Sequence, residues 1–218
     1  MQLIMKYLRN CLLPLCALAL AAFCAQTSAL AADPPNPTAA TTAKADDTEV
    51  AVISTPEGDM VVQFWDDAAP ATIANFKKLA KDKFYDGTAF HRIIRGFMVQ
   101  GGDPNTKDLN NEAAYGSGGP KYTIQDEKNK HKHERGVIAM ANTGAPNSGG
   151  SQFYICLAPQ PGLDRANYTT FGHLIKGDDV LEKIGNTPVK RSARGEMSVP
   201  TKRVELISIK IVALSSVK

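Results

Sequence analysis

The stretch Phe90-His91-Arg92-Ile93-Ile94-Arg95-Gly96-Phe97-Met98-Val99-Gln100-Gly101-Gly102-Asp103 decides how the rest of this chain is interpreted. Two shorter blocks of similar character follow it, Met140-Ala141-Asn142 and Gly150-Ser151-Gln152-Phe153-Tyr154-Ile155. In all three, apolar residues typical of β-strands are interrupted by an arginine, a glutamine or an asparagine. Isolated polar side chains on apolar strands are the pattern expected of a binding groove.

Short apolar runs bounded by turn residues predict further strands around these blocks. The expected strands cover residues 49–55, 60–65, 89–94, 97–100, 137–141, 152–157, 170–175 and 204–212. Many short strands with few helices indicate an all-β sandwich or barrel, and strand spacing alone does not choose between the two.

Two helices are expected among these strands. Pro70 can begin the first, because its missing N–H costs nothing at that position. Its apolar face consists of Ile73, Phe76, Leu79 and Ala80. The second should run from 178 to 184, with Asp178 or Asp179 as its cap.

The three blocks together resemble the cyclophilin family of peptidyl-prolyl cis/trans isomerases, and the resemblance covers residues 49–218. It implies a mainly β fold, a closed eight-stranded antiparallel β-barrel capped by two α-helices. In such a fold the barrel interior is filled by the core and ligands bind in a groove outside. It also implies an enzyme that needs no metal and no cofactor.

The chemistry of X–Pro isomerisation suits these residues. Rotation about the bond takes roughly tens to hundreds of seconds uncatalysed, because the nitrogen lone pair is delocalised into the carbonyl. A guanidinium that donates a hydrogen bond to the pyramidal nitrogen stabilises the twisted state alone and so raises kcat. Arg92 is the candidate for this role, and we interpret His91 as its structural support.

The remaining roles follow from the resemblance. Gln100 and Asn142 are the expected catalytic partners of Arg92. The expected substrate-binding residues are Phe97, Met98, Ala141, Gln152, Tyr154, Leu163 and Tyr168.

The chain departs from well-known eukaryotic members of the family near this groove. Gly162 stands where tryptophan is frequent, Tyr168 where histidine is frequent, and Tyr154 where phenylalanine is common. These differences predict weak inhibition by cyclosporin with an intact catalytic centre. Residues 104–115 form a longer segment, which we expect to be an exposed loop beside the groove.

The N-terminal region predicts export. Lys6 and Arg9 precede an apolar run over residues 11–25, and Ala29-Leu30-Ala31 follows, which together are typical of a cleavable signal peptide at residues 1–31. A membrane-spanning helix would need about 18 or more apolar residues, and this run is shorter. Residues 32–48 are rich in Pro, Ala and Thr and predict a flexible linker. A periplasmic protein with no membrane attachment after cleavage is therefore expected.

Charge and cysteine content exclude several other classes. Loss of residues 1–31 removes Lys6 and Arg9, so 23 Lys and Arg remain against 22 Asp and Glu, which offers no basic footprint for nucleic acid. Cys156 is then the one cysteine left, and its apolar neighbours favour a buried thiol over a reactive one. We expect no metal at His131 and His133, which we interpret as part of a solvated basic loop.

Two classes of function remain open. The first is an isomerase that accelerates folding of exported proteins by acting on unfolded or exposed proline-containing segments. The second is a proline-segment binding module or holdase chaperone on the same fold. Arg92 favours the enzyme, and nothing in the chain requires more than a monomer.

Overall fold

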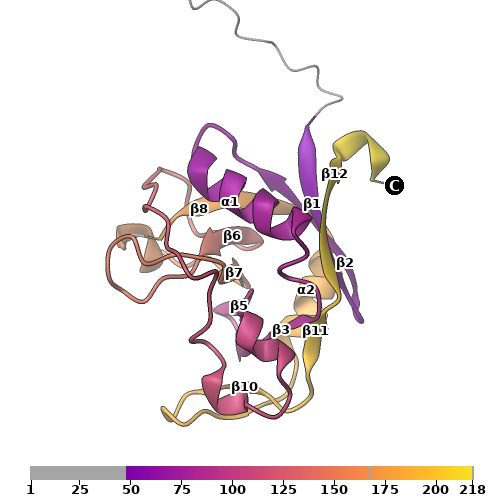
Figure 1. Ribbon diagram of the computed structural model, residues 1–218, viewed down its shortest axis with the longest axis vertical. Coiled ribbons are helices and arrows are strands. Elements are labelled where there is room, and N and C mark those ends of the chain that lie inside the picture. Colours follow the sequence, from indigo (N-terminus) through magenta and orange to yellow (C-terminus); the bar gives the residue numbers. More distant parts are fainter. Residues whose placement is uncertain (1–47, 167, 218) are drawn as a thin grey trace, which may run out of the picture. The chain divides into compact units, whose positions relative to one another are not determined.

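The computed structural model describes residues 48–166 and 168–217, which form twelve β-strands, two α-helices and four short 3-10 helices (Figure 1). The strands are β1 (Glu49–Thr55), β2 (Gly58–Phe64), β3 (Thr88–Phe90), β4 (Arg92–Ile94), β5 (Met98–Gly101), β6 (Val137–Met140), β7 (Phe153–Cys156), β8 (Thr170–Lys176), β9 (Val189–Arg191), β10 (Met197–Pro200), β11 (Val204–Leu206) and β12 (Ser208–Ala213). The helices are α1 (Pro70–Lys81), α2 (Asp178–Gly185), η2 (Pro104–Lys107), η3 (Glu112–Ala114), η4 (Leu163–Arg165) and η5 (Leu214–Ser216). Each strand expected from the sequence is present to within a few residues, but those expected at 89–94 and 204–212 are each divided into two strands.

Eight of the strands form one curled antiparallel sheet in the order β12-β1-β2-β8-β6-β7-β5-β4 (Figure 1). The mainly β fold with two α-helices is therefore confirmed. The closed barrel is not, because the edge strands β12 and β4 do not pair with each other. The chain bends at His91 and at Ile207, and the residues before these bends, β3 and β11, pair in a separate two-stranded sheet.

The first and last strands of the large sheet are neighbours. β1 pairs with β12 over its length, with Glu49 opposite Ala213. One step beyond, the backbone N–H of Leu214 donates to the carbonyl of Thr48 over 2.8 Å. The two ends of the described chain are therefore held together by the sheet itself.

Helix α1 begins at Pro70, as expected from the sequence. Its N-cap residue makes no side-chain hydrogen bond, and the carboxylate of Glu127 takes over that role from a distant segment. Glu127 accepts hydrogen bonds from the backbone N–H groups of Ala71 at 3.0 Å and Thr72 at 2.7 Å. A carboxylate at this end also complements the helix dipole.

Helix α2 also lies where it was expected, but the predicted aspartate cap is wrong. Asp178 and Asp179 belong to the first turn, and the N-cap is Gly177 with φ of 91°. A Cβ at Gly177 would lie 2.4 Å from the carbonyl oxygen of Asp59. Only glycine combines this positive φ with so close an approach of two backbones.

One large core lies between the sheet and both helices. Phe76 of α1 is fully buried, and its ring packs against Phe153 at 5.5 Å and Phe171 at 5.3 Å. Val180, Leu181 and Ile184 of α2 belong to the same core. The predicted apolar face of α1 and the apolar residues of α2 are therefore both buried.

Strand alternation separates this core from a second, smaller apolar cluster. On β7, Phe153 and Ile155 face the core, whereas Tyr154 and Cys156 face the other way. Met98 and Ala139 join Tyr154 and Cys156 in the smaller cluster. This outer face of the sheet carries the candidate site.

The N-terminal signal peptide and all of the linker except Thr48 lie outside the described residues, so both stay predictions. Within residues 48–166 and 168–217, no helix is long and apolar enough to cross a membrane. The hairpin of β9 and β10 was not expected from the sequence.

Candidate active site

A row of side chains crosses four neighbouring strands on the outer face of the sheet. Arg92 on β4 lies opposite Gln100 on β5, Gln100 lies opposite Tyr154 on β7, and Tyr154 lies opposite Ala139 on β6. Directly opposed residues on antiparallel strands place their side chains next to one another. The strand register alone therefore brings the arginine, the glutamine and the tyrosine together.

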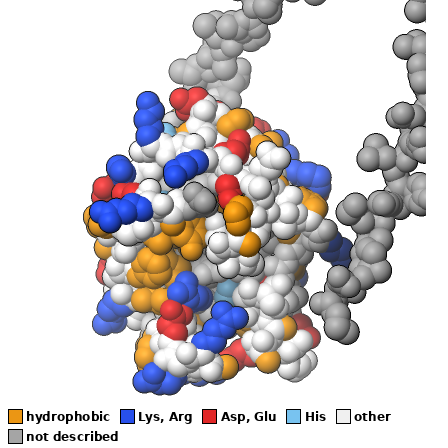
Figure 2. All heavy atoms as spheres, turned by 90° about the vertical axis from the view of Figure 1, so that its left-hand side faces the viewer, with side chains coloured by type: hydrophobic (Ala, Val, Ile, Leu, Met, Phe, Trp, Pro, Cys, Tyr) orange, Lys and Arg blue, Asp and Glu red, His pale blue; other side chains and the backbone are white. Residues whose placement is uncertain are grey.

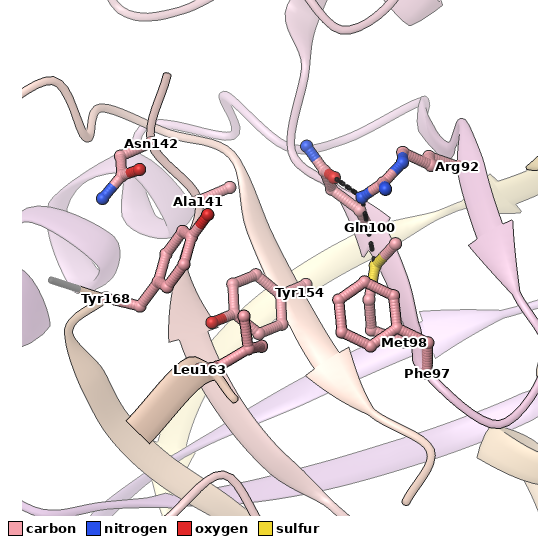
Figure 3. Close-up of a pocket in the computed structure, with 9 residues that line it drawn as sticks. All are labelled: Arg92, Phe97, Met98, Gln100, Ala141, Asn142, Tyr154, Leu163 and Tyr168. Carbon is pink, nitrogen blue, oxygen red and sulfur yellow. Dashed lines mark hydrogen bonds between the residues drawn. The ribbon is translucent and has the colours of Figure 1, made fainter. Parts of the chain in front are cut away.

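A pocket of about 90 Å³ lies over this row (Figure 3). It is lined by Arg92, Phe97, Met98, Gln100, Ala141, Asn142, Tyr154, Leu163 and Tyr168. In Figure 3, Arg92 and Gln100 stand on one side, Asn142, Ala141 and Tyr168 on the other, and apolar side chains lie between them. Nine of the ten residues selected from the sequence thus surround one pocket, and their roles stay predictions.

On one face of the domain, hydrophobic side chains gather in a patch, with Lys and Arg side chains above and below it (Figure 2).

The Arg92 guanidinium contacts four side chains. Its Nη1 donates to Oε1 of Gln100 over 3.2 Å and lies 3.9 Å from the sulfur of Met98. Its Nε and Nη2 donate to the two carboxylate oxygens of Glu196, over 2.7 and 2.8 Å. The guanidinium carbon is also 5.9 Å from the centre of the Phe97 ring.

Gln152 is the one selected residue that does not line the pocket. Its Oε1 accepts a hydrogen bond from Nε2 of Gln100 at 3.0 Å, and its own Nε2 donates to the carbonyl of Gly118 at 2.9 Å. Gln152 therefore connects the pocket to the loop that follows β5, and it is placed to orient Gln100.

That loop is organised by Asp103, which is fully buried. One carboxylate oxygen accepts from the N–H of Asn105 at 2.8 Å, and the other accepts from the N–H groups of Gly116 and Gly118. Most of residues 104–115 are exposed, as expected, and they contain the short helices η2 and η3. Asp103 thus fixes both ends of the loop beside the pocket.

On the opposite side of the pocket, Asn142 lies two residues beyond the end of strand β6. Its Oδ1 accepts a hydrogen bond from the N–H of Gly144 at 3.0 Å. The side chain is therefore held in a local turn at the edge of the pocket.

The interpretation of His133 as a solvated loop residue is wrong. Its side chain is only 3% exposed, and both its backbone N–H and its Nδ1 lie within hydrogen-bonding distance of Oδ1 of Asp164, at 2.9 and 3.0 Å. The hydrogen bonds from His133 hold the pKa of Asp164 below its ordinary value. The imidazole also stacks on Tyr154 and meets Tyr168 edge-on.

His133 thus supports two aromatic residues of the pocket from behind. The basic residues next to His133 in the sequence gave no indication of this role. His131 packs elsewhere, on the ring of Trp65 at 3.8 Å. Among the described residues, no group of three or more His, Cys, Asp or Glu side chains is arranged to hold a metal ion.

Two further buried groups belong to the site. Cys156 is buried, as expected, and burial raises the pKa of its thiol to about 12. Burial likewise raises the pKa of the Tyr154 phenol. Neither group is ionised near neutral pH, so the apolar part of the pocket carries no charge.

Sequence reasoning missed Glu196 entirely. It follows β9 in the unexpected hairpin, far along the chain from Arg92, and the ion pair with Arg92 holds its pKa below the ordinary value. No local pattern around Glu196 indicates this contact.

Comparisons with known proteins place the chain in one family. The family model described as cyclophilin type peptidyl-prolyl cis-trans isomerase matches residues 50–211. A peptidyl-prolyl cis-trans isomerase of Synechococcus elongatus is 49% identical over 122 residues, which are 56% of this chain and 77% of the relative. Peptidyl-prolyl cis-trans isomerase B of Bacillus subtilis is 43% identical over 136 residues, which are 62% of this chain and 88% of that protein.

A solved structure is also similar. It is a cyclophilin type peptidyl-prolyl cis-trans isomerase of Cryptosporidium parvum, crystallised in the presence of the dipeptide Ala-Pro. The TM-score is 0.66 at 30% identity, and the likeness covers 75% of this chain and 99% of that one. With the family model matched over most of the domain, the chain belongs to the cyclophilin-type peptidyl-prolyl cis-trans isomerases and is an enzyme that interconverts the cis and trans forms of X–Pro bonds.

Proposed function

We propose that this isomerase acts on X–Pro bonds in unfolded or exposed segments of exported proteins, and that its place of action is the periplasm. The export signal expected at residues 1–31 supports this location. Slow X–Pro rotation limits the folding of many chains, so an exported catalyst would shorten that step. The Ala-Pro dipeptide used with the Cryptosporidium relative supports proline-containing segments as ligands.

In the proposed mechanism, the proline ring occupies the apolar part of the pocket. Phe97, Met98, Tyr154 and Leu163 enclose it, and Ala141 and Tyr168 extend the rim. The ring is held in every state of the reaction, so these contacts contribute to binding of substrate and of the twisted state alike.

Arg92 acts on the nitrogen. As the bond twists, the nitrogen becomes pyramidal and its lone pair can accept a hydrogen bond from the guanidinium. This bond forms only in the twisted state and therefore lowers the barrier. Gln100 orients the guanidinium and binds the flanking peptide, and the backbone at Asn142 holds the peptide from the opposite side.

The single observation that carries this proposal is the position of Arg92 at the edge of an apolar pocket, with Nη1 turned to Gln100 and Met98. A proline-isomerisation assay on a short X–Pro peptide, with Arg92→Ala as the control, tests it. Catalysis that is lost in Arg92→Ala supports the enzyme. Peptide binding without catalysis in the wild type would favour the binding module or holdase.

The location is tested separately. N-terminal sequencing or the intact mass of the exported protein should give a mature chain that begins near Ala32. A full-length product embedded in the membrane would overturn it. Because the pocket is complete within one chain, we also propose a monomer, which light scattering of the mature protein can measure.

A further inference from the structure

Glu196 is bound to Arg92 through two hydrogen bonds. Nε of Arg92 donates to Oε2 at 2.7 Å, and Nη2 donates to Oε1 at 2.8 Å. Many single ion pairs at a protein surface contribute little, but a two-point contact between a guanidinium and a carboxylate also fixes their relative orientation. This contact therefore sets the plane in which the guanidinium lies.

The carboxylate does not line the pocket. It occupies the Nε and Nη2 edge of the guanidinium and leaves Nη1 turned toward Gln100 and Met98. The Nη1 group that would contact the substrate and the Nε and Nη2 groups that bind Glu196 thus belong to one planar guanidinium, so fixing one edge orients the other.

The hairpin that carries Glu196 is itself well ordered by hydrogen bonds. The N–H of Ser192 donates to the carbonyl of Glu196 at 2.7 Å, and the N–H of Gly195 donates back to the carbonyl of Ser192 at 2.9 Å. The side chain of Arg191 donates to the carbonyl of Gly195 at 2.6 Å. These bonds fix the backbone from which the Glu196 side chain extends.

A second ion pair anchors the same hairpin. Lys190 on β9 lies 2.9 Å from the carboxylate of Glu112 in η3. This pair ties the hairpin to the loop after β5 without touching Arg92, so it offers a matched control.

We propose that Glu196 is a positioning residue of the isomerase, which holds the Arg92 guanidinium so that Nη1 is directed at the proline nitrogen. The inference rests on the catalytic role proposed for Arg92. A long arginine side chain has many rotamers, and an enzyme gains rate when the donor is oriented before the substrate twists. The ion pair with Arg92 keeps the pKa of Glu196 low, so the carboxylate is ionised at neutral pH.

The experiment compares Glu196→Gln with Glu112→Gln in the mature protein. Glutamine is nearly the same size but is uncharged, and its NH2 donor replaces one of the two acceptor oxygens, so the two-point contact with the guanidinium is lost. We expect kcat to fall about three- to tenfold, the size of effect produced by releasing one immobilised side chain. Affinity for an X–Pro peptide should change less than twofold, and Glu112→Gln should behave as the wild type.

A double-mutant cycle separates positioning from a merely structural role. If Glu196 acts through Arg92, then Glu196→Gln should cause no further loss in the Arg92→Ala background. The Arg92 Nε–H resonance in a nitrogen-15 spectrum should also move in Glu196→Gln and stay in place in Glu112→Gln.

Three results would overturn the inference. They are an unchanged or higher kcat in Glu196→Gln, an equal loss in Glu112→Gln, or a Glu196→Gln loss that persists without Arg92. If instead Arg92→Ala itself keeps the wild-type rate, the role proposed for Arg92 fails, which the same data set shows directly.

Discussion

Arg92 and Gln100 lie opposite each other on adjacent antiparallel strands, and Nη1 of Arg92 donates to Oε1 of Gln100 over 3.2 Å. Gln100 in turn donates to Gln152, which donates to the carbonyl of Gly118. The arginine thus lies at one end of a chain of hydrogen bonds that reaches the loop after β5. A shift of Gly118 in that loop would therefore act on the guanidinium through these hydrogen bonds.

Replacing Arg92 by Lys should restore little of the activity lost in Arg92→Ala. An ammonium on a flexible stem cannot bind Glu196 and Gln100 together as the planar fork does. Loss of a charge-assisted hydrogen bond in the twisted state costs about 1.5–3 kcal/mol, so kcat/KM should fall roughly ten- to a hundredfold.

Phe97→Ala gives the contrast, because the ring contact is present in every state and both affinity and kcat/KM should fall. NMR exchange measurements on a bound X–Pro peptide give both quantities for each variant. An Arg92→Lys enzyme with the wild-type rate would contradict the role of the planar guanidinium.

Gly162→Trp should strengthen binding of cyclosporin, which the resemblance to cyclophilins makes the natural probe. Gly162 has φ of −66° and ψ of −35°, and a Cβ built there meets no atom within 4 Å. The backbone therefore accepts a side chain at this position, and a tryptophan next to Leu163 should add apolar contact area worth about 1–3 kcal/mol, roughly tenfold or more in affinity. Calorimetric titration of both proteins measures it, and isomerisation of a short peptide should stay within about twofold of the wild type. Equal affinities would show that this position does not contact the drug.

Asp103→Asn should destabilise the domain and loosen the loop of residues 104–118. The buried carboxylate accepts three backbone N–H bonds, and an amide offers one acceptor oxygen in their place. Leaving a buried donor unsatisfied costs about 1–3 kcal/mol of unfolding free energy. Urea denaturation measures the change, with Asp108→Asn as the control in the exposed part of the same loop. Equal losses in the two variants would be evidence against a special role for Asp103.

Acidification should destabilise the protein before its carboxylates are titrated. Burial lowers the pKa of His91, and of His173 as well, below the ordinary value of 6.5. Between that value and the lower folded pKa, the unfolded chain binds more protons than the native one, so the free energy of unfolding decreases as pH falls. Urea denaturation at about pH 7.5 and about pH 5 should show the loss, and it should be smaller in His91→Gln. A flat profile would mean that both imidazoles protonate freely in the native state.

The Cys156 thiol should resist modification in the native protein. Its pKa is raised to about 12 by burial, so almost no thiolate is present at neutral pH, and the thiolate is the reactive species. A disulfide reagent at about pH 8 should therefore label the unfolded mature protein and leave the native protein almost unlabelled. Rapid labelling of the native protein would reveal an opening of the pocket floor.

The sequence predicted those parts of the fold in which apolar residues repeat along a strand or helix. β7 is an example, because the alternation of Phe153 and Tyr154 separates core from pocket. Nine pocket residues were found in another way, through the resemblance to the cyclophilin family, whose motifs contain them.

The parts that were missed depend on contacts between distant segments. Residues 189–200 contain too many charged residues to indicate a strand, so the β9–β10 hairpin and Glu196 escaped notice. His133 sits in a basic run, and only the approach of Asp164 makes its burial favourable. The closed barrel was not confirmed because the chain bends at His91 and at Ile207. The local conformational preferences of the sequence do not indicate these two bends.

The hydrogen bond between Leu214 and Thr48 has a consequence for protein engineering. The first and last strands of the domain end side by side, so the domain can be inserted into a surface loop of a host protein with both junctions close together. The ends can equally be joined by a short peptide and new ends cut in an exposed turn, such as the one at residues 192–196. The pocket strands β4 to β7 lie in the middle of the chain, so the first rearrangement leaves Arg92 with all its partners. The second cuts the turn beside Glu196 and removes the hydrogen bonds that hold the backbone of this residue.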